Sequence, residues 1–98
     1  MAKGYIIAFY QSVNDPDRLA EYAPLAGKAI AEAGGRILVR GGQVKALENG
    51  VAERTVVIEF DSYDDALNYY AGDVYQAALA ALGEGAVVRE IRAVEGVE

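Results

Sequence analysis

The sequence predicts an α+β domain of ferredoxin-like topology, β-α-β-β-α-β, in which a four-stranded antiparallel sheet carries two helices on one face. Three observations support this prediction. Four short runs are rich in β-branched and aromatic residues, two longer segments repeat apolar residues every three or four positions, and turn residues separate them. The chain has 98 residues, so residues 1–98 are expected to form a single domain.

The first elements are expected to be a strand and a helix. Residues 5–10 (YIIAFY) are short, aromatic and β-branched, which is typical of a strand. The segment 14–17 (NDPD) predicts a helix start, with a capping side chain followed by a proline at the first helical position. Pro24 is expected to kink or divide this helix because it lacks a backbone donor. Gly34 and Gly35 predict its end.

The middle of the chain predicts a hairpin. Arg36–Arg40 reads as a strand that continues, after a bulge at the glycine pair 41–42, through residues 44–47. Asn49-Gly50 is a strong signal for a two-residue turn, because both central residues of a type I′ turn need positive φ. Thr55–Phe60 (TVVIEF) is expected to be the returning strand.

The last third of the chain predicts a second helix and a fourth strand. Ser62 is placed to cap the helix. Gly72 and Asp73 interrupt it, and Asp73 is expected to cap its continuation to Leu82. Residues 86–94 are then expected to form the final strand.

One face of the predicted sheet needs a cover other than the helices. A strand with one face in water alternates apolar and polar residues, but residues 5–9 and 56–58 are apolar on both faces. One interpretation is a partly exposed apolar face, which is common. The interpretation we favour is a homodimer that buries this face against a second copy.

The composition excludes several classes of function. Cysteine and histidine are absent, so we expect no disulfide, no metal site built on these residues, no catalytic triad and no cofactor. The net charge of −6 argues against nucleic-acid binding, which normally needs a basic surplus. No apolar run is long enough to span a bilayer and no signal peptide is recognisable, so we expect a cytoplasmic protein without membrane contact.

Two arginines in the second strand are candidates for holding a ligand. Arg36 and Arg40 each lie two residues from Leu38, so a regular strand would direct both to one face. An arginine in apolar surroundings needs an anionic partner, because burying its charge unpaired is costly. Without a bulge, a two-residue turn would place Arg40 opposite Glu59. The partner is therefore either the carboxylate or phosphate of a ligand, or this structural glutamate.

Glu59 is the strongest acidic candidate for catalysis. It lies between two apolar residues of a strand, and a desolvated carboxylate has a raised pKa that suits a general acid or base. The alternatives are the ion pair with an arginine, or an edge position that faces water.

Seven tyrosines in 98 residues have two interpretations. Each ring has a large apolar body and one hydroxyl, so it suits both a core and the wall of a pocket for an oxygenated ligand. Tyr5 and Tyr69 are candidate ligand contacts, and Tyr70 is a candidate for proton transfer. Ser62 is a further candidate contact, although its position also suits a helix cap.

A set of short segments along the chain matches a known family. They are GY at 4–5, GGRILVRGG at 34–42, ERTVVIEF at 53–60, Ser62, Ala66, Tyr69-Tyr70, YQAA at 75–78 and VEG at 94–96. Together they resemble the bacterial family called domain of unknown function 1330, over nearly the whole chain. The resemblance implies the dimeric α/β-barrel superfamily, in which two ferredoxin-like subunits pack sheet to sheet.

That superfamily includes cofactor-independent monooxygenases, haem-degrading enzymes, lactone isomerases and chlorite-dismutase-like proteins, whereas the family itself has no assigned activity. Three hypotheses follow. The protein binds a small organic anion or oxygenated metabolite in a pocket, or it is a cofactor-independent enzyme that uses Arg40, Glu59 and Tyr70, or it is a structural or protein-interaction module. The sequence does not decide whether the protein is an enzyme.

Overall fold

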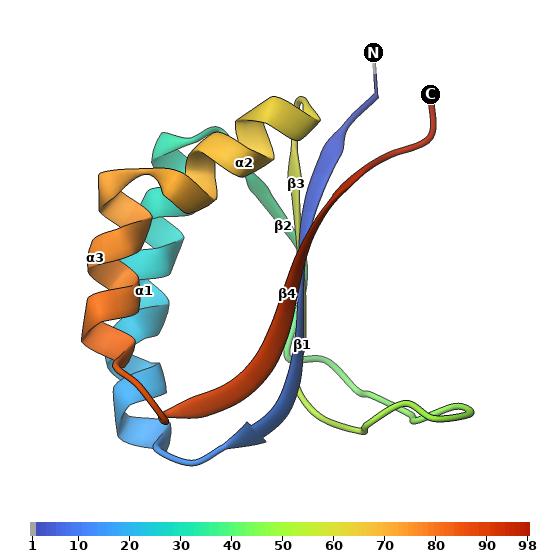
Figure 1. The fold of residues 1–98 in the computed structure, drawn as a ribbon. Coiled ribbons are helices and arrows are strands. Elements are labelled where there is room, and N and C mark those ends of the chain that lie inside the picture. Colours follow the sequence, from blue (N-terminus) through green and yellow to red (C-terminus); the bar gives the residue numbers. More distant parts are fainter. Residues whose placement is uncertain (1) are drawn as a thin grey trace.

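In the computed structural model, which describes residues 2–98, one antiparallel sheet is covered on one face by helices (Figure 1). The elements in chain order are β1 (Gly4–Val13), α1 (Pro16–Glu32), β2 (Arg36–Arg40), β3 (Thr55–Phe60), α2 (Tyr63–Ala71), α3 (Asp73–Leu82) and β4 (Val87–Glu95). The strand order is β2-β3-β1-β4. The predicted ferredoxin-like topology is therefore confirmed. Within residues 2–98, no helix is both long enough and apolar enough to cross a bilayer.

The two predicted helix starts are confirmed. The side chain of Asp15 accepts a hydrogen bond from the backbone nitrogen of Arg18 at 3.1 Å, and Pro16 occupies the first helical position of α1. The hydroxyl of Ser62 accepts one from the backbone nitrogen of Asp65 at 3.1 Å at the start of α2. Both bonds satisfy donors that have no partner inside the helix.

Two details of the helices differ from the predictions. Pro24 lies inside α1 without dividing it, so the helix is continuous from Pro16 to Glu32. Gly72 separates α2 from α3 as expected, but Gly72 itself occupies the capping position and no side chain bonds there. Asp73 is the first residue of α3 and not its cap. Its carboxylate therefore stabilises α3 only by its favourable interaction with the dipole of the helix.

The core lies between the helices and the inner face of the sheet. Alternation along β1 and β3 points Ile6, Ile58 and Phe60 toward the helices, where they are buried. Phe60 and Tyr75 are the largest fully buried side chains, each worth roughly 1.5–3 kcal/mol of burial. This packing fixes the distance between the helix layer and the sheet.

A β-bulge in the middle of β2, at Leu38, separates two arginines that a regular strand would place together. Arg36 pairs with Glu59 of β3, whereas Arg40 pairs with Val56, and the register shifts between them. One extra residue turns every following side chain to the other face of the sheet. Arg36 therefore lies on the face without helices and Arg40 on the helix side. The predictions that they share a face, and that Arg40 lies opposite Glu59, are wrong.

The predicted antiparallel pairing of β2 with β3 is confirmed, but the strand extension through residues 44–47 and the two-residue turn are wrong, because β2 ends at Arg40 and residues 41–54 form a loop. Gly41 has φ of +69° and directs the chain out of the sheet. The tight turn involves Leu47 and Gly50, whose carbonyl oxygen and backbone nitrogen are 2.9 Å apart, and the positive φ falls on Glu48. The loop extends away from the helices, beyond the open face of the sheet (Figure 1).

An ion-pair cluster occupies one end of the open face. Arg36 Nε donates to Glu59 Oε1 at 2.8 Å, and its Nη2 donates to Asp61 Oδ1 at 3.1 Å. The hydroxyl of Tyr5 donates to Glu59 Oε2 at 3.2 Å. The hydrogen bond from Arg36 is the main cause that lowers the pKa of Glu59, burial opposes it, and the bond from Tyr5 adds to the lowering. Glu59 is thus a paired structural carboxylate.

We expect Glu59→Gln to destabilise the protein near neutral pH and to have little effect in acid. A carboxyl group whose pKa is lowered by folding stabilises the native state above its unfolded pKa, and this contribution is lost as pH falls through the folded pKa. Urea denaturation of both proteins across that range measures the difference. Glu84→Gln, on an exposed turn, is the control. A destabilisation that stays constant or grows as pH falls would contradict the pairing.

Candidate functional site

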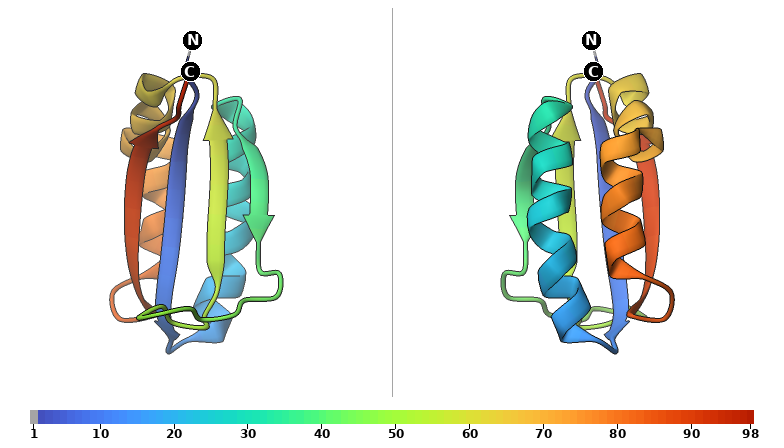
Figure 2. Two further views of the ribbon diagram at one scale, coloured as in Figure 1. Left: turned by 90° about the vertical axis from the view of Figure 1, so that its right-hand side faces the viewer. Right: turned by 90° about the vertical axis from the view of Figure 1, so that its left-hand side faces the viewer.

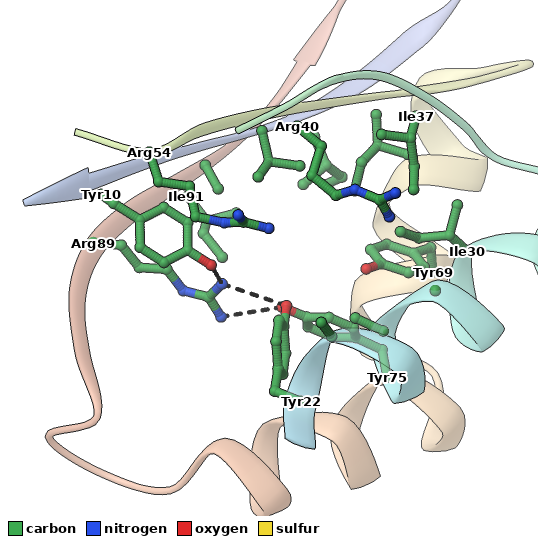
Figure 3. A pocket seen from close by; sticks show the side chains of 17 residues that line it. Tyr10, Tyr22, Ile30, Ile37, Arg40, Arg54, Tyr69, Tyr75, Arg89 and Ile91 are labelled. Carbon is green, nitrogen blue, oxygen red and sulfur yellow. Dashed lines mark hydrogen bonds between the residues drawn. The ribbon is translucent and has the colours of Figure 1, made fainter. Parts of the chain in front are cut away.

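A small cavity of about 50 Å³ lies between the sheet and the helices (Figure 3). Its polar lining consists of the side chains of three arginines and four tyrosines, namely Arg40, Arg54, Arg89, Tyr10, Tyr22, Tyr69 and Tyr75. The other ten lining residues are isoleucine, valine, alanine and glycine. None of the seventeen carries a carboxylate or an amide side chain, so the lining is cationic and rich in hydrogen-bond donors.

Arg89 of β4 is the central charged group of the cavity. Its Nη1 donates to the hydroxyl oxygens of Tyr10 at 2.9 Å and Tyr22 at 3.3 Å. Its Nη2 donates to the hydroxyl of Tyr75 at 3.2 Å. The guanidinium also lies over the rings of Tyr10 and Tyr22, 5.5 and 5.2 Å from their centroids. Within residues 2–98, no carboxylate lies within ion-pair distance of Arg89.

The tyrosine hydroxyls around Arg89 have hydrogens left to donate. The hydroxyl oxygens of Tyr22 and Tyr75 are 2.8 Å apart, so one donates to the other and the acceptor keeps its own hydrogen free. Tyr10 accepts from Arg89 and keeps its hydrogen as well. Burial raises the pKa of Tyr75, so its hydroxyl stays protonated at neutral pH. The cluster therefore offers O–H as well as N–H donors to the cavity.

Arg54 adds a second cation beside this cluster. It lies at the end of the loop, one residue before β3, and its guanidinium carbon is 5.7 Å from the ring centroid of Tyr10. Its Nε is buried and has no hydrogen-bond partner. A buried donor without a partner costs about 1–3 kcal/mol, so the native state is destabilised at this atom unless a ligand accepts from it.

Arg40 brings the third cation to the cavity from the other end of the same loop. The bulge at Leu38 turns its side chain to the helix side, where it lines the cavity (Figure 3). Its side chain is exposed and forms no hydrogen bond or ion pair within the described part of the chain. The loop 41–54 thus starts directly after Arg40 and ends at Arg54, and both of these arginines line the same cavity.

The charges of these arginines give the cavity a positive field with no compensating protein anion. Burial opposes the charge of Arg89, but its interactions with Tyr22 and Tyr75 outweigh this and raise its pKa, so it stays protonated. Like charges in a partly desolvated space repel each other unless an anion lies between them. The described acidic residues do not form a cluster that could hold a metal ion either. The cavity is suited to a ligand that is negatively charged and accepts hydrogen bonds.

The structure brings only part of the predicted site residues together. Arg40 and Tyr69 line the cavity, and Tyr70 lies outside its lining with its ring against Tyr75, 5.1 Å between centroids. The other four predicted residues are elsewhere, namely Arg36, Glu59 and Tyr5 in the ion-pair cluster on the open face and Ser62 at the cap of α2. The predicted combination of Arg40 with Glu59 and Tyr70 in one site is therefore wrong.

Arg54 and Arg89, with the tyrosines at positions 10, 22 and 75, were not predicted as site residues. A signal for Arg89 was present, because it occupies the apolar row of β4. This row consists of every second residue, Val87, Arg89, Ile91 and Ala93, whose side chains are partly buried on the helix side. An arginine in the apolar row of a strand is the same signal that pointed to Arg40. No comparable signal exists for Arg54, which lies in a loop.

Solved structures similar to this chain share its fold. A protein of unknown function from Rhodopseudomonas palustris is similar over 99% of this chain and 84% of its own, with a TM-score of 0.75 and 14% identity. A dimeric ferredoxin-like protein of unknown function from Thermobifida fusca has a TM-score of 0.56 and 20% identity, over 96% of this chain and 89% of its own. SnoaB, a cofactor-independent oxygenase from Streptomyces nogalater, has a TM-score of 0.62 and 12% identity, over 100% of this chain and 96% of its own.

These identities are low, so the likeness is one of fold. No curated protein matches the chain. A family model described as domain of unknown function (DUF1330) matches residues 3–97, which is nearly the full length and agrees with the resemblance of the sequence. The chain therefore belongs to the DUF1330 family.

Proposed function

We propose that this protein binds a small organic anion in the cavity between its sheet and helices. The observation that carries the proposal is the pairing of Arg89 with three tyrosine hydroxyls and no carboxylate. Neutral hydroxyls solvate a guanidinium but do not neutralise it, and an uncompensated charge that is partly removed from water destabilises the native state. An anion that accepts hydrogen bonds from Arg89 and from the unpaired Nε of Arg54 offsets this cost.

The cavity supports binding more strongly than acid-base catalysis. Its lining contains no carboxylate or imidazole that could accept a proton at neutral pH. Glu59, the catalytic candidate from the sequence, lies on the opposite face of the sheet and is held as a carboxylate by Arg36. The likeness to SnoaB concerns the fold alone, so the oxygenase activity of that protein is not transferred to this chain.

We also propose that the protein acts as a homodimer joined through the open face of the sheet, which has no helix over it (Figure 2). Apolar side chains lie along this face on all four strands, namely Ile7, Phe9, Val39, Val57, Val88 and Val94. The loop 41–54 carries further apolar side chains on the same side, and Leu47 is 70% exposed. A second copy would bury both surfaces, and the fold-related protein from Thermobifida fusca is described as dimeric.

A thermal-shift screen of Arg54→Gln against the wild type tests the anion site. Short carboxylates and inorganic phosphate are the probes, and a ligand at a hundred times its Kd stabilises the folded state by about 2.7 kcal/mol. We expect a concentration-dependent rise in Tm for the wild type, and a Kd at least about tenfold weaker for Arg54→Gln. The variant should fold well, because Arg54 Nε has no partner to lose.

Arg18→Gln is the matched control, because it removes the same charge from an exposed position on α1. It should leave the ligand-induced shift unchanged. The proposed site would be contradicted if no probe raised the Tm of the wild type. It would also be contradicted if the ligand-induced rise in Tm were the same for Arg54→Gln as for Arg18→Gln.

Light scattering of Val57→Glu tests the dimer. Val57 is next to Ile7 at the centre of the open face, so a carboxylate there should prevent a second copy from packing. We expect the wild type at micromolar concentration to have twice the chain mass of 10.4 kDa, and Val57→Glu to have the mass of one chain. Leu67→Glu, an exposed position on α2, is the control and should stay dimeric. A monomeric wild type would overturn the proposal.

A further inference from the structure

The cations of the cavity lie at two ends of it. Figure 3 shows the guanidinium groups of Arg54 and Arg89 together beside Tyr10, whereas that of Arg40 lies apart from them, near Ile37 and Tyr69. The two ends differ in their donors. The first offers two guanidinium groups and the tyrosine hydroxyls around Arg89, and the second offers the free fork of Arg40.

Apolar side chains form most of the remaining walls of the cavity. Val56 and Ile58 of β3 belong to the sheet wall, and Ala26 and Ile30 of α1 belong to the helix wall. These side chains give no hydrogen bond to a ligand, so a polar or charged group against them would lose its water without compensation. The cavity thus combines two separate cationic groups with apolar walls.

We infer that the ligand is a short dicarboxylate with one carboxylate at each end of an apolar carbon chain. This rests on the proposed function, since it names the class of anion that the same cavity takes. A monocarboxylate would contact only one end and would leave the other end, such as the exposed guanidinium of Arg40, paired with water alone. A compact dianion such as inorganic phosphate carries both charges on one group and has the same deficiency.

The size of the cavity limits the length of the ligand. A volume of about 50 Å³ corresponds to roughly three to five water positions, which suits a ligand of about four or five carbon atoms, carboxylates included. The carboxylate at the first end would accept from Arg89 and Arg54, and the one at the second end from Arg40. Each pair is a charge-assisted hydrogen bond of the strong kind.

Calorimetric titration of the full-length protein with matched acids tests the inference. Succinate and glutarate are compared with butyrate and valerate, which have the same carbon counts and one carboxylate fewer, and with inorganic phosphate. Arg40→Gln is the informative variant. We expect the dicarboxylates to bind the wild type at least about tenfold more tightly than the monocarboxylates and phosphate. We expect Arg40→Gln to remove this advantage, so that its affinity for the dicarboxylates falls to the level of its affinity for the monocarboxylates.

Three outcomes separate this inference from the proposed function. If monocarboxylates or phosphate bind as tightly as dicarboxylates, the cavity is an anion site and the two-ended ligand is wrong. If Arg40→Gln lowers the affinity for both classes of acid equally, Arg40 does not bind the second carboxylate and the inference also fails. If no anion binds the wild type while circular dichroism shows it folded, the proposed function fails together with the inference.

Discussion

The guanidinium of Arg89 connects four elements of the fold. It projects from β4 and donates to hydroxyls carried by β1, α1 and α3, at Tyr10, Tyr22 and Tyr75. These bonds fix the spacing between the edge of the sheet and both long helices, because each hydroxyl must be within about 3 Å of one planar group. The same arrangement leaves a positive charge without a protein anion. Structural order and an affinity for anions therefore arise from the same residue.

The second constraint is the bulge in β2. It assigns Arg36 to the open face, where Glu59 and Asp61 neutralise it, and Arg40 to the cavity, where nothing in the described chain does. A regular strand that kept Arg36 opposite Glu59 would have placed Arg40 on the same open face and left the cavity without this cation. One inserted residue thus separates a structural ion-pair cluster from a cationic pocket, on opposite sides of a single sheet.

The sequence predicted what depends on local patterns. Element order, the capping roles of Asp15 and Ser62, and the break at Gly72 follow from residue types at fixed spacing, and all are present. It did not predict the bulge, because no sequence feature at Leu38 distinguishes a bulged residue from a regular strand residue. The two-residue turn was predicted wrongly because Asn49-Gly50 gives the same local signal whether or not strands flank it directly.

The site was predicted only in part, for a physical reason. Arg40 and Tyr69 could be nominated singly, but their convergence with Arg54 and Arg89 depends on register and on the depth of the helix layer. Glu59 was nominated as a desolvated carboxylate, and it pairs with Arg36 instead of Arg40 because the loop 41–54 replaces the two-residue turn that would have set the other register. Convergence of distant side chains is a tertiary property, and alternation within a strand fixes only which face each one takes.

Nitrogen-15 NMR of the arginine side chains during titration with succinate tests the anion site most directly. We expect the Nε–H resonances of Arg54 and Arg89 to shift together and saturate, while that of Arg36, on the opposite face, stays in place. Shifts confined to Arg36 or other open-face arginines, or no saturable shift at any arginine of the folded protein, would contradict it.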